Sequence, residues 1–207
     1  MASYSSQDRQ SVARFTPLSM QEDVIDGSIV SGEWIKLAAK RFLRLKDDSR
    51  YIFREDKADK VVNVFSMLRR LTGKHAGRKF ILQPWQQFII ASIYGFYVKD
   101  TGKRLVNYVF IEMARKNGKT AFAAGLCLYH LIADGESDAE VDLATNSKDQ
   151  AKIAFKFCKQ FSKGLDSNEK YLRPYRDKIL YDRWYHNSKC SLRMIPSWTD
   201  STLLCIL

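Results

Sequence analysis

Apolar residues recur at helical spacing over much of the first half of the chain. Between about Val24 and Leu71, two runs repeat at intervals of three and four residues, which is typical of helices with one buried face. These runs are Ile35, Ala38, Ala39, Phe42 and Leu45, followed by Val61, Val64, Phe65 and Leu68. Pro84 suits the first turn of a further helix. We therefore expect a loose polar N-terminus over residues 1–20 and a helical segment over residues 21–78.

The pattern changes in the second half of the chain. Residues 107–113 are aromatic and β-branched, which predicts a short buried strand, and residues 140–145 predict a second one. Between them, residues 119–134 are apolar almost all round, as in a helix buried against a sheet. Ser147 and Gln150 have the spacing of a capping box and open another helix. This βαβ order predicts an α/β fold with a parallel sheet, and the segments "KILYDRWY" and "CSLRMIPS" near the end predict a hairpin.

The amino-acid composition indicates a soluble globular protein. Apolar residues make up 45% and charged residues 28% of the 207 residues, as in soluble globular proteins, and the sequence contains no transmembrane or signal segment. The four cysteines are scattered with no CxxC pair, and three of them lie in apolar patterns, which favours buried thiols in a reducing cytoplasm. The three histidines lack the spacing of metal ligands.

The chain is strongly basic. Its net charge is +11, from 34 basic and 23 acidic residues, which favours polyanionic partners such as nucleic acid. Residues 40–79 contain 13 basic and 5 acidic residues, a net charge of +8. This segment is either a set of solvated helix faces or a surface that meets phosphates.

The stretch "FIEMARKNGKT", residues 110–120, ends like a phosphate-binding loop. In such loops backbone N–H groups cradle the phosphates, a lysine reaches the β- and γ-phosphates and a hydroxyl binds Mg²⁺. Gly118, Lys119 and Thr120 supply the last three positions, between a predicted strand and a predicted helix. Met113 stands where such loops carry their first glycine. Arg115 could stabilise transition-state charge on the γ-phosphate, or it could point to solvent.

Several segments together resemble the large terminase subunit of tailed bacteriophages, the motor that packages DNA into capsids. "ARKNGKT" is preceded by "LQPWQ" and followed by "ATNSKDQA", and the upstream block "GSIVSGEWIKLAAKRFLRL" also matches. The resemblance runs from about Val24 to Asp200. That family tolerates a residue other than glycine at the first loop position and carries an arginine within the loop.

The resemblance implies ATP and Mg²⁺ as cofactors and assigns roles to individual residues. Lys119 would bind the β- and γ-phosphates, Thr120 would hold Mg²⁺, and Arg115 would act as an arginine finger, so that Arg115 and Lys119 are the catalytic candidates. Gln86 would read adenine, because a side-chain amide can both donate and accept hydrogen bonds. The implied nucleotide-binding residues are Gln86, Ala114, Arg115, Lys116, Asn117, Gly118, Lys119 and Thr120.

The resemblance also implies double-stranded DNA as a partner. In the full-length family we expect contacts with a small terminase subunit and a portal, and self-association into a ring, in the cytoplasm of a bacterial host. The family continues into a Walker B strand ending in Asp-Glu and a nuclease domain, neither of which occurs here, and Asp142 lies inside the second predicted strand. We therefore expect residues 79–207 to form a partial, truncated P-loop NTPase core with impaired hydrolysis.

Two other functions remain open at this stage. One is a non-catalytic basic protein that binds nucleic acid, which the net charge of residues 40–79 also supports. The other is a different P-loop enzyme, such as a helicase-type ATPase or a small-molecule kinase. A helicase-type ATPase would share the adenine-reading glutamine and the βαβ core.

Overall fold

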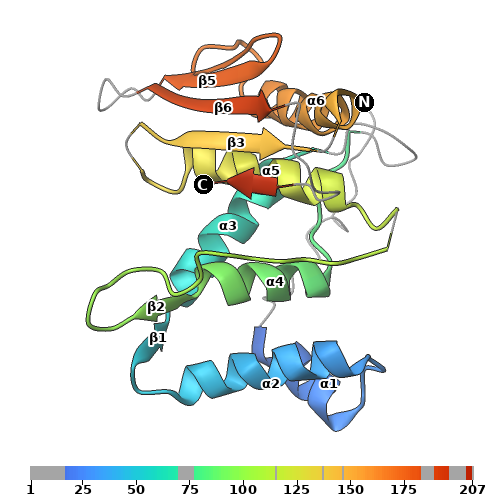
Figure 1. The fold of residues 1–207 in the computed structure, drawn as a ribbon, viewed down its shortest axis with the longest axis vertical. Coiled ribbons are helices and arrows are strands. Elements are labelled where there is room, and N and C mark those ends of the chain that lie inside the picture. Colours follow the sequence, from blue (N-terminus) through green and yellow to red (C-terminus); the bar gives the residue numbers. More distant parts are fainter. Residues whose placement is uncertain are drawn as a thin grey trace, which may run out of the picture. The chain divides into compact units, whose positions relative to one another are not determined.

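The fold is mixed α/β, as the sequence predicts, with helices preceding the main sheet along the chain (Figure 1). The computed structural model describes residues 17–69, 77–114, 116–136, 138–145, 147–182, 189–195 and 204–206. The chain divides into two compact units. The first unit comprises residues 1–59 and 82–109, and the second comprises residues 60–81 and 110–207.

The first unit is mainly helical and confirms the helical spacing of the N-terminal half. A two-stranded antiparallel sheet joins its helices, with Tyr51 opposite Val98 and Phe53 opposite Phe96. Its elements are α1 (Pro17–Asp26), α2 (Glu33–Asp47), β1 (Tyr51–Phe53), the start of α3 (Glu55–Met67), α4 (Pro84–Tyr94) and β2 (Phe96–Val98). Pro84 is the first residue of α4, as predicted from its fixed φ and missing N–H.

Aromatic packing forms the core of the first unit. The ring of Phe42 lies 5.3 Å from that of Phe53, 5.8 Å from that of Phe88 and 5.0 Å from that of Phe96, measured between centroids. Burying a phenylalanine side chain contributes about 1.5–3 kcal/mol to folding. This cluster therefore fixes α2 and α4 against the small sheet.

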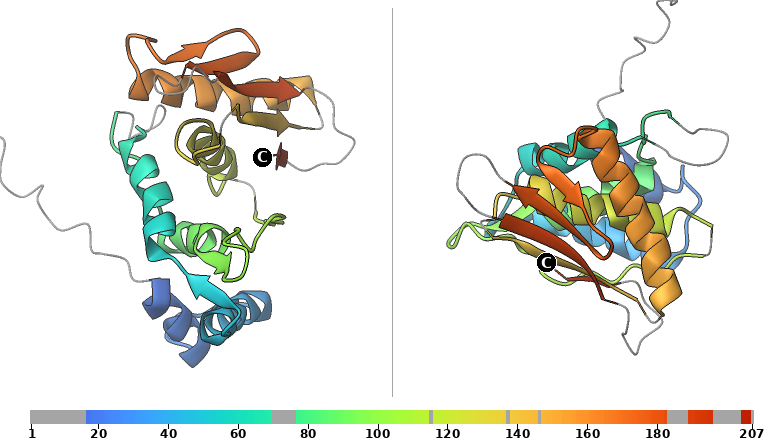
Figure 2. Two further views of the ribbon diagram at one scale, coloured as in Figure 1. Left: turned by 90° about the vertical axis from the view of Figure 1, so that its left-hand side faces the viewer. Right: turned by 90° about the horizontal axis from the view of Figure 1, so that it is seen from above.

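The second unit is a five-stranded sheet with two helices along it (Figure 2). The strand order is β4-β5-β6-β3-β7, and both α5 and α6 contact β3 and β6. Val141, Leu143 and Leu192 alternate with more exposed polar residues along these strands and are buried. The elements are α5 (Lys119–Ile132), β3 (Glu140–Ala144), α6 (Lys148–Leu165), β4 (Leu172–Pro174), β5 (Lys178–Asp182), β6 (Lys189–Ile195) and β7 (Leu204–Ile206).

The sheet is mixed rather than parallel. Only β3 and β6 run parallel among the described strands, whereas β5 and β6 form the predicted antiparallel hairpin and β7 pairs antiparallel with β3. The hairpin makes the sheet mixed. Its second strand, β6, pairs with β3, and its first strand, β5, lies on the other side of β6 and runs antiparallel to it.

The strand predicted over residues 107–113 is not formed. These residues carry no strand pairing, and Tyr108 and Phe110 are 96% and 78% exposed. An aromatic and β-branched run has the side chains of a strand, but a strand must also pair with the edge of a sheet. Both edges of β3 are occupied, one by β6 and the other by β7.

A second aromatic cluster builds the core of the second unit. Phe65, from the last part of α3, lies 5.6 Å from Phe80 and 5.5 Å from Phe122, and Phe80 lies 6.0 Å from Phe161. The ring of Phe65 also occupies the space where a Cβ on Gly125 of α5 would lie. A glycine is therefore needed there so that α3 and α5 can pack closely.

Other sequence expectations concern cysteines and membranes. Cys127, Cys158 and Cys190 are buried free thiols, as predicted from their apolar surroundings. Among the described residues, no helix combines the length and the apolar character required to cross a bilayer.

Candidate functional site

The loop before α5 has the backbone shape of a tight turn into a helix. Gly118 is left-handed, with φ 76° and ψ 14°, and α5 begins at Lys119. The carbonyl oxygen of Gly118 accepts the first helical bond, from the N–H of Phe122, at 3.0 Å. Only glycine adopts this conformation at little cost, which explains its place in the sequence.

This turn leaves the start of α5 open to an anion. Gly118 provides no side-chain cap, so the first N–H groups of the helix keep their hydrogen-bonding capacity. The side chains of Asn117 and Lys119 are exposed, and Thr120 is half-buried. Free N–H groups, the helix dipole and a lysine together can hold a phosphate.

Lys116 is a second unusual position in the loop. Its φ is 72°, in the left-handed region that a side chain with a Cβ enters at a cost of about 1 kcal/mol. Such strain is often found at functional sites. Arg115, the predicted arginine finger, lies outside the described residues, so its role stays a prediction.

Met113 occupies the position where phosphate-binding loops usually have a glycine. Its φ is not among the positive values in the loop, which belong to Lys116 and Gly118. The backbone at Met113 therefore accepts a residue with a side chain, and the exposed Ala114 beside it needs no special conformation either.

The far end of α5 is fixed by a buried polar cluster. Nδ1 of His130 lies 2.8 Å from Oδ2 of Asp134, and the hydroxyl of Tyr129 donates to Oδ1 of the same carboxylate at 3.2 Å. Backbone N–H groups of Ala133 and Asp134 bond the carbonyl of Tyr129. The helix that carries the loop is thus held firmly at its opposite end.

The end of β3 leads into α6 through side-chain caps. Oγ of Ser147 accepts from the backbone N–H of Gln150 at 3.3 Å, which confirms the predicted cap at this helix. The hydroxyl of Thr145 donates to the carbonyl of Ser147 at 2.7 Å.

Asp142 lies in the middle of β3, where the sequence places it, and it is paired. Nε of Arg193 lies 3.0 Å from its Oδ1, and the same guanidinium reaches Oε2 of Glu140 at 2.8 Å. Hydrogen bonding to Asp142 and the two nearby carboxylates raise the pKa of Arg193. No local pattern in the sequence indicates this pairing, because it depends on the parallel register of β3 and β6. Among the described residues, no group of three or more acidic, cysteine or histidine side chains could hold a metal ion.

Gln86, the predicted adenine reader, belongs to the first unit, whereas the loop belongs to the second. Its side chain is buried, with the residue 4% exposed, and its Oε1 accepts from the backbone N–H of Gln83 at 2.9 Å. Gln86 therefore caps the start of α4. The spacing of Gln83 and Gln86, three residues apart before an apolar helix, is a capping signal that sequence reasoning missed. The amide oxygen retains one lone pair and the amide nitrogen its donors.

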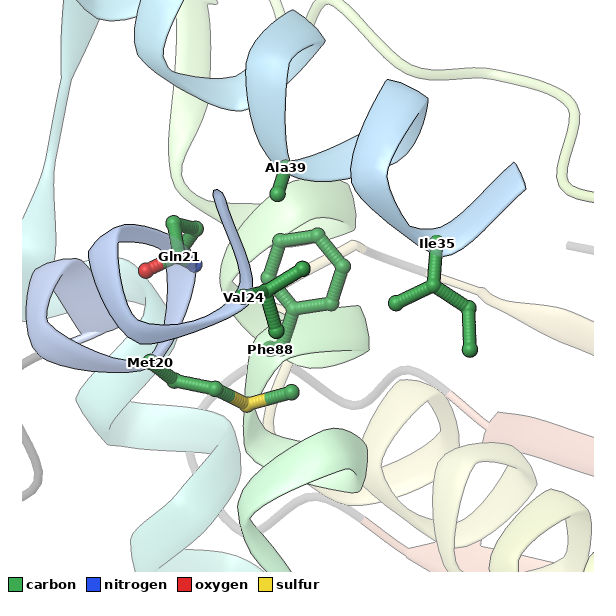
Figure 3. A pocket seen from close by; sticks show the side chains of 6 residues that line it. All are labelled: Met20, Gln21, Val24, Ile35, Ala39 and Phe88. Atoms are coloured by element: carbon green, nitrogen blue, oxygen red, sulfur yellow. The ribbon is translucent and has the colours of Figure 1, made fainter. Parts of the chain in front are cut away.

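A small pocket lies between α1, α2 and α4 of the first unit (Figure 3). Its lining consists of Met20, Gln21, Val24, Ile35, Ala39 and Phe88. The side chains leave no room for a water molecule, so this pocket does not admit a nucleotide.

Some basic residues between Lys40 and Lys79 have local partners. The guanidinium of Arg50 forms a fork with Asp48, with Nη2 2.7 Å from Oδ2, and this hydrogen bonding lowers the pKa of Asp48 to about 2. Arg54 pairs with Asp56 at 3.1 Å. The positive charge that remains available to a partner is therefore smaller than the sequence count indicates.

An α/β unit in which a loop with a left-handed glycine opens a buried helix is typical of part of a P-loop NTPase core. The comparison with protein families specifies the class. The family described as terminase large subunit, ATPase domain, matches residues 84–187, about half of the chain. The chain therefore belongs to the terminase large subunit ATPase family.

Family membership assigns the chain an ATPase role in a phage terminase. Nucleotide, DNA and components of a packaging complex are the general classes of ligand and partner for such a role. No match was found among curated proteins or among solved structures.

Proposed function

We propose that residues 114–120 bind the phosphates of ATP as the nucleotide site of a DNA-packaging ATPase. The observation that carries the proposal is the left-handed Gly118 before α5, which leaves first-turn N–H groups and the exposed Lys119 facing outward. Lys119 binds the β- and γ-phosphates, and Asn117 and Lys116 shape the loop. The site lies within the stretch that matches the ATPase family.

Two further residues help to neutralise the negative charge of the phosphates in this proposal. The hydroxyl of Thr120, in the first turn of α5, holds Mg²⁺, which neutralises phosphate charge when bound. Arg115 stabilises the charge that develops on the γ-phosphate. Arg115 and Lys119 are thus the catalytic candidates.

We also propose that the polypeptide 1–207 by itself binds nucleotide but hydrolyses it slowly. A hydrolytic site needs a carboxylate that orients water. Asp142 is engaged by Arg193, and the sequence contains no apolar strand ending in Asp-Glu. Steady-state phosphate release should stay near background, and rapid turnover that Lys119→Ala abolishes would contradict this proposal.

Nucleotide binding is tested by titration with a fluorescent ATP analogue. Charge-assisted hydrogen bonds contribute about 1.5–3 kcal/mol, so Lys119→Ala should weaken binding roughly 10- to 100-fold. Lys156→Ala, which removes an exposed lysine from α6, is the matched control and should bind like the unsubstituted chain. Equal affinities for both variants would exclude the loop as the site. Thr120→Ala should remove the effect of Mg²⁺ on affinity while leaving Mg²⁺-free binding unchanged.

Adenine recognition by Gln86 is a separate proposal. Because Oε1 of Gln86 caps α4, an alanine substitution would disturb the helix as well as the base contact. Gln86→Glu keeps an oxygen for the cap but loses the amide donor. The variant should fold normally and lose preference for ATP over GTP; an unchanged preference would assign Gln86 to capping alone.

We further propose duplex DNA as the translocated polymer, with a small terminase subunit, a portal and further copies of the chain as partners in the bacterial cytoplasm. The net charge of +11 supports a polyanionic partner. Affinity for duplex DNA should fall steeply with salt concentration. DNA binding without loop-dependent nucleotide binding would favour the second candidate, a non-catalytic basic nucleic-acid-binding protein.

A further inference from the structure

Large apolar side chains are exposed where α1 leads into α2. Val30 is 98% exposed and Trp34 is 85% exposed, and Leu37 is also exposed one turn farther along α2. Trp34, Leu37 and Arg41 share one face of α2 because they lie three and seven residues apart. The opposite face of this helix carries Phe42, which is buried in the core of the first unit.

The corner that presents these side chains is firmly held. The backbone N–H of Ile29 donates to the carbonyl of Asp23 at 2.8 Å, which ties the connection to α1. The N–H of Ser28 donates to Oδ1 of Asp26 at 2.8 Å, and the N–H of Lys36 bonds the carbonyl of Gly32 at 3.2 Å. Beneath the corner, the closed pocket of Figure 3 packs Ile35 of α2 with residues of α1 and α4. The exposed apolar side chains therefore stand on a fixed base.

The same helix is rich in cations. α2 contains five basic and two acidic residues. Within the part of the chain that the structure describes, Lys40, Arg41 and Arg44 form no ion pair, unlike Arg50 and Arg54. Lys40, Arg41 and Arg44 follow the exposed apolar residues directly along α2.

The positive charge of this surface indicates which kind of partner fits it. In an isologous contact with a second copy, the same cations would face one another, and the two copies would repel each other. Duplex DNA would match the cations but would leave Val30 and Trp34 without apolar partners. An occupant that carries apolar side chains and carboxylates satisfies both parts of the surface.

We propose that Val30, Trp34, Leu37, Lys40, Arg41 and Arg44 form a docking surface for an acidic, amphipathic helical segment of a partner protein. Apolar side chains of the segment cover Val30, Trp34 and Leu37. Its carboxylates meet Lys40, Arg41 and Arg44, which fixes the direction of the bound helix. None of these six residues belongs to the proposed nucleotide site, which consists of residues 114–120 and Gln86.

The test uses a synthetic acidic peptide of about 18 residues, long enough to form a helix, with leucines at helical spacing and glutamates around them. The control peptide has the same composition in an order that destroys the apolar face. Calorimetry on the full chain should show binding of the first peptide and at least ~10-fold weaker binding of the control. The tryptophan emission of the chain should shift to the blue as Trp34 is covered.

Substitutions separate the apolar and charged parts of the surface. Trp34→Ala should weaken peptide binding by roughly 30-fold, as is typical of a tryptophan anchor. Ile153→Ala, at another exposed apolar residue on α6, is its matched control and should have no effect. The pair Lys40→Glu and Arg41→Glu should weaken binding about 10-fold, whereas Lys156→Glu should not. Circular dichroism checks that each variant is folded.

Three results would overturn the proposal. Equal binding of both peptides would reduce the surface to a general cation patch. Dimerisation of the chain that Trp34→Ala abolishes would identify a second copy as the occupant. Binding of duplex DNA or of phosphatidylglycerol vesicles that depends on Trp34, with no binding of the amphipathic peptide, would assign the surface to a polyanion or a lipid.

Discussion

Gln21 is a polar residue in an apolar environment. Its side chain lies in the closed pocket of the first unit, the residue is 1% exposed, and neither Nε2 nor Oε1 has a hydrogen-bond partner. A buried amide without partners costs about 1–3 kcal/mol. Leucine has a similar volume and no polar atoms. We expect Gln21→Leu to raise the free energy of unfolding by about 1 kcal/mol, measured by urea denaturation.

The control for this prediction is Gln21→Ala, which removes the amide but leaves a void, so that its gain should be smaller or absent. Destabilisation by leucine would show that the amide contributes to folding at this position.

Asp166 links stability to pH at the end of α6. Its Oδ2 accepts hydrogen bonds from the backbone N–H groups of Leu172, at 2.9 Å, and Tyr171, at 2.6 Å. These bonds favour the carboxylate and lower its pKa below the ordinary value of 3.8. Because the native pKa is depressed, the stabilisation is present above pH 3.8 and is lost as the pH falls through the native pKa.

Asp166→Asn keeps the acceptor oxygen and removes the charge, so it isolates the titration. We expect the variant to be less stable at neutral pH and the difference from the unsubstituted chain to vanish in strong acid. Thermal unfolding over a pH series measures this convergence, and a difference that does not shrink as the pH falls below 3.8 would contradict the assignment.

Individual residues could be predicted where a local rule fixes them. Gly118 before an apolar helix, Pro84 at a first turn and Ser147 at a cap were all visible, since each depends on a few neighbouring residues. The capping bond of Gln86 was also local but was overlooked. The contact between Arg193 and Asp142 joins residues far apart in the chain, so no local rule could reveal it.

At the scale of elements, α3 and α5 pack closely only because Gly125 has no side chain. A Cβ at this position would overlap the ring of Phe65, which is fully buried. We expect Gly125→Ala to destabilise the protein by about 1–3 kcal/mol through overpacking, although alanine favours helix. Chemical denaturation measures the effect.

Gly164 of α6 provides the matched control. Nothing lies within 4 Å of a Cβ built there, so Gly164→Ala should stabilise the chain by about 0.5–1 kcal/mol. Phe65→Leu should recover part of the loss in the Gly125→Ala background. A neutral Gly125→Ala would mean that the ring moves aside without cost.

Helices and the hairpin were predictable from periodicity, but sheet pairing was not. The apolar run over residues 119–134 and the apolar face from Ala151 to Phe161 have a helical pattern, and α5 and α6 form there. The run over residues 107–113 has a strand-like pattern and forms no strand, because pairing depends on which edges other segments occupy. Parallel and antiparallel pairing likewise depend on topology, which alternation along one strand does not encode.

For the whole molecule, the chain passes between the two units more than once. Residues 60–81 belong to the second unit although residues 82–109 belong to the first. The division at residue 79 proposed from the sequence follows chain order and stays a prediction about the extent of the ATPase core. Contacts between distant segments, such as Phe80 with Phe161, define the units instead.

Residues 107–113 offer a site for limited proteolysis. Tyr108 and Phe110 are exposed in a segment without strand pairing, whereas the exposed Trp34 lies in α2. We expect brief chymotrypsin treatment to cut first after Tyr108 or Phe110, because proteases bind extended backbone. Mass spectrometry identifies the cut, and substitution of both residues by serine should suppress it.

The two fragments should stay associated after this cut. Phe65 and Phe80 remain on the N-terminal fragment but pack with Phe122 and Phe161 of the C-terminal one. Size-exclusion chromatography should therefore show a single nicked species, and separate elution of the fragments would contradict the interleaved arrangement.

The shared aromatic core also has a consequence for biosynthesis. A ribosome releases residues 60–81 long before α5 and α6 exist, while the first unit can close as soon as residues 82–109 emerge. The side chains of Phe65, Leu68 and Phe80 then stay exposed to water until the helices that cover them have been synthesised. We expect chaperones to bind these three side chains during translation, and slow decoding between codons 82 and 118 to prolong their exposure.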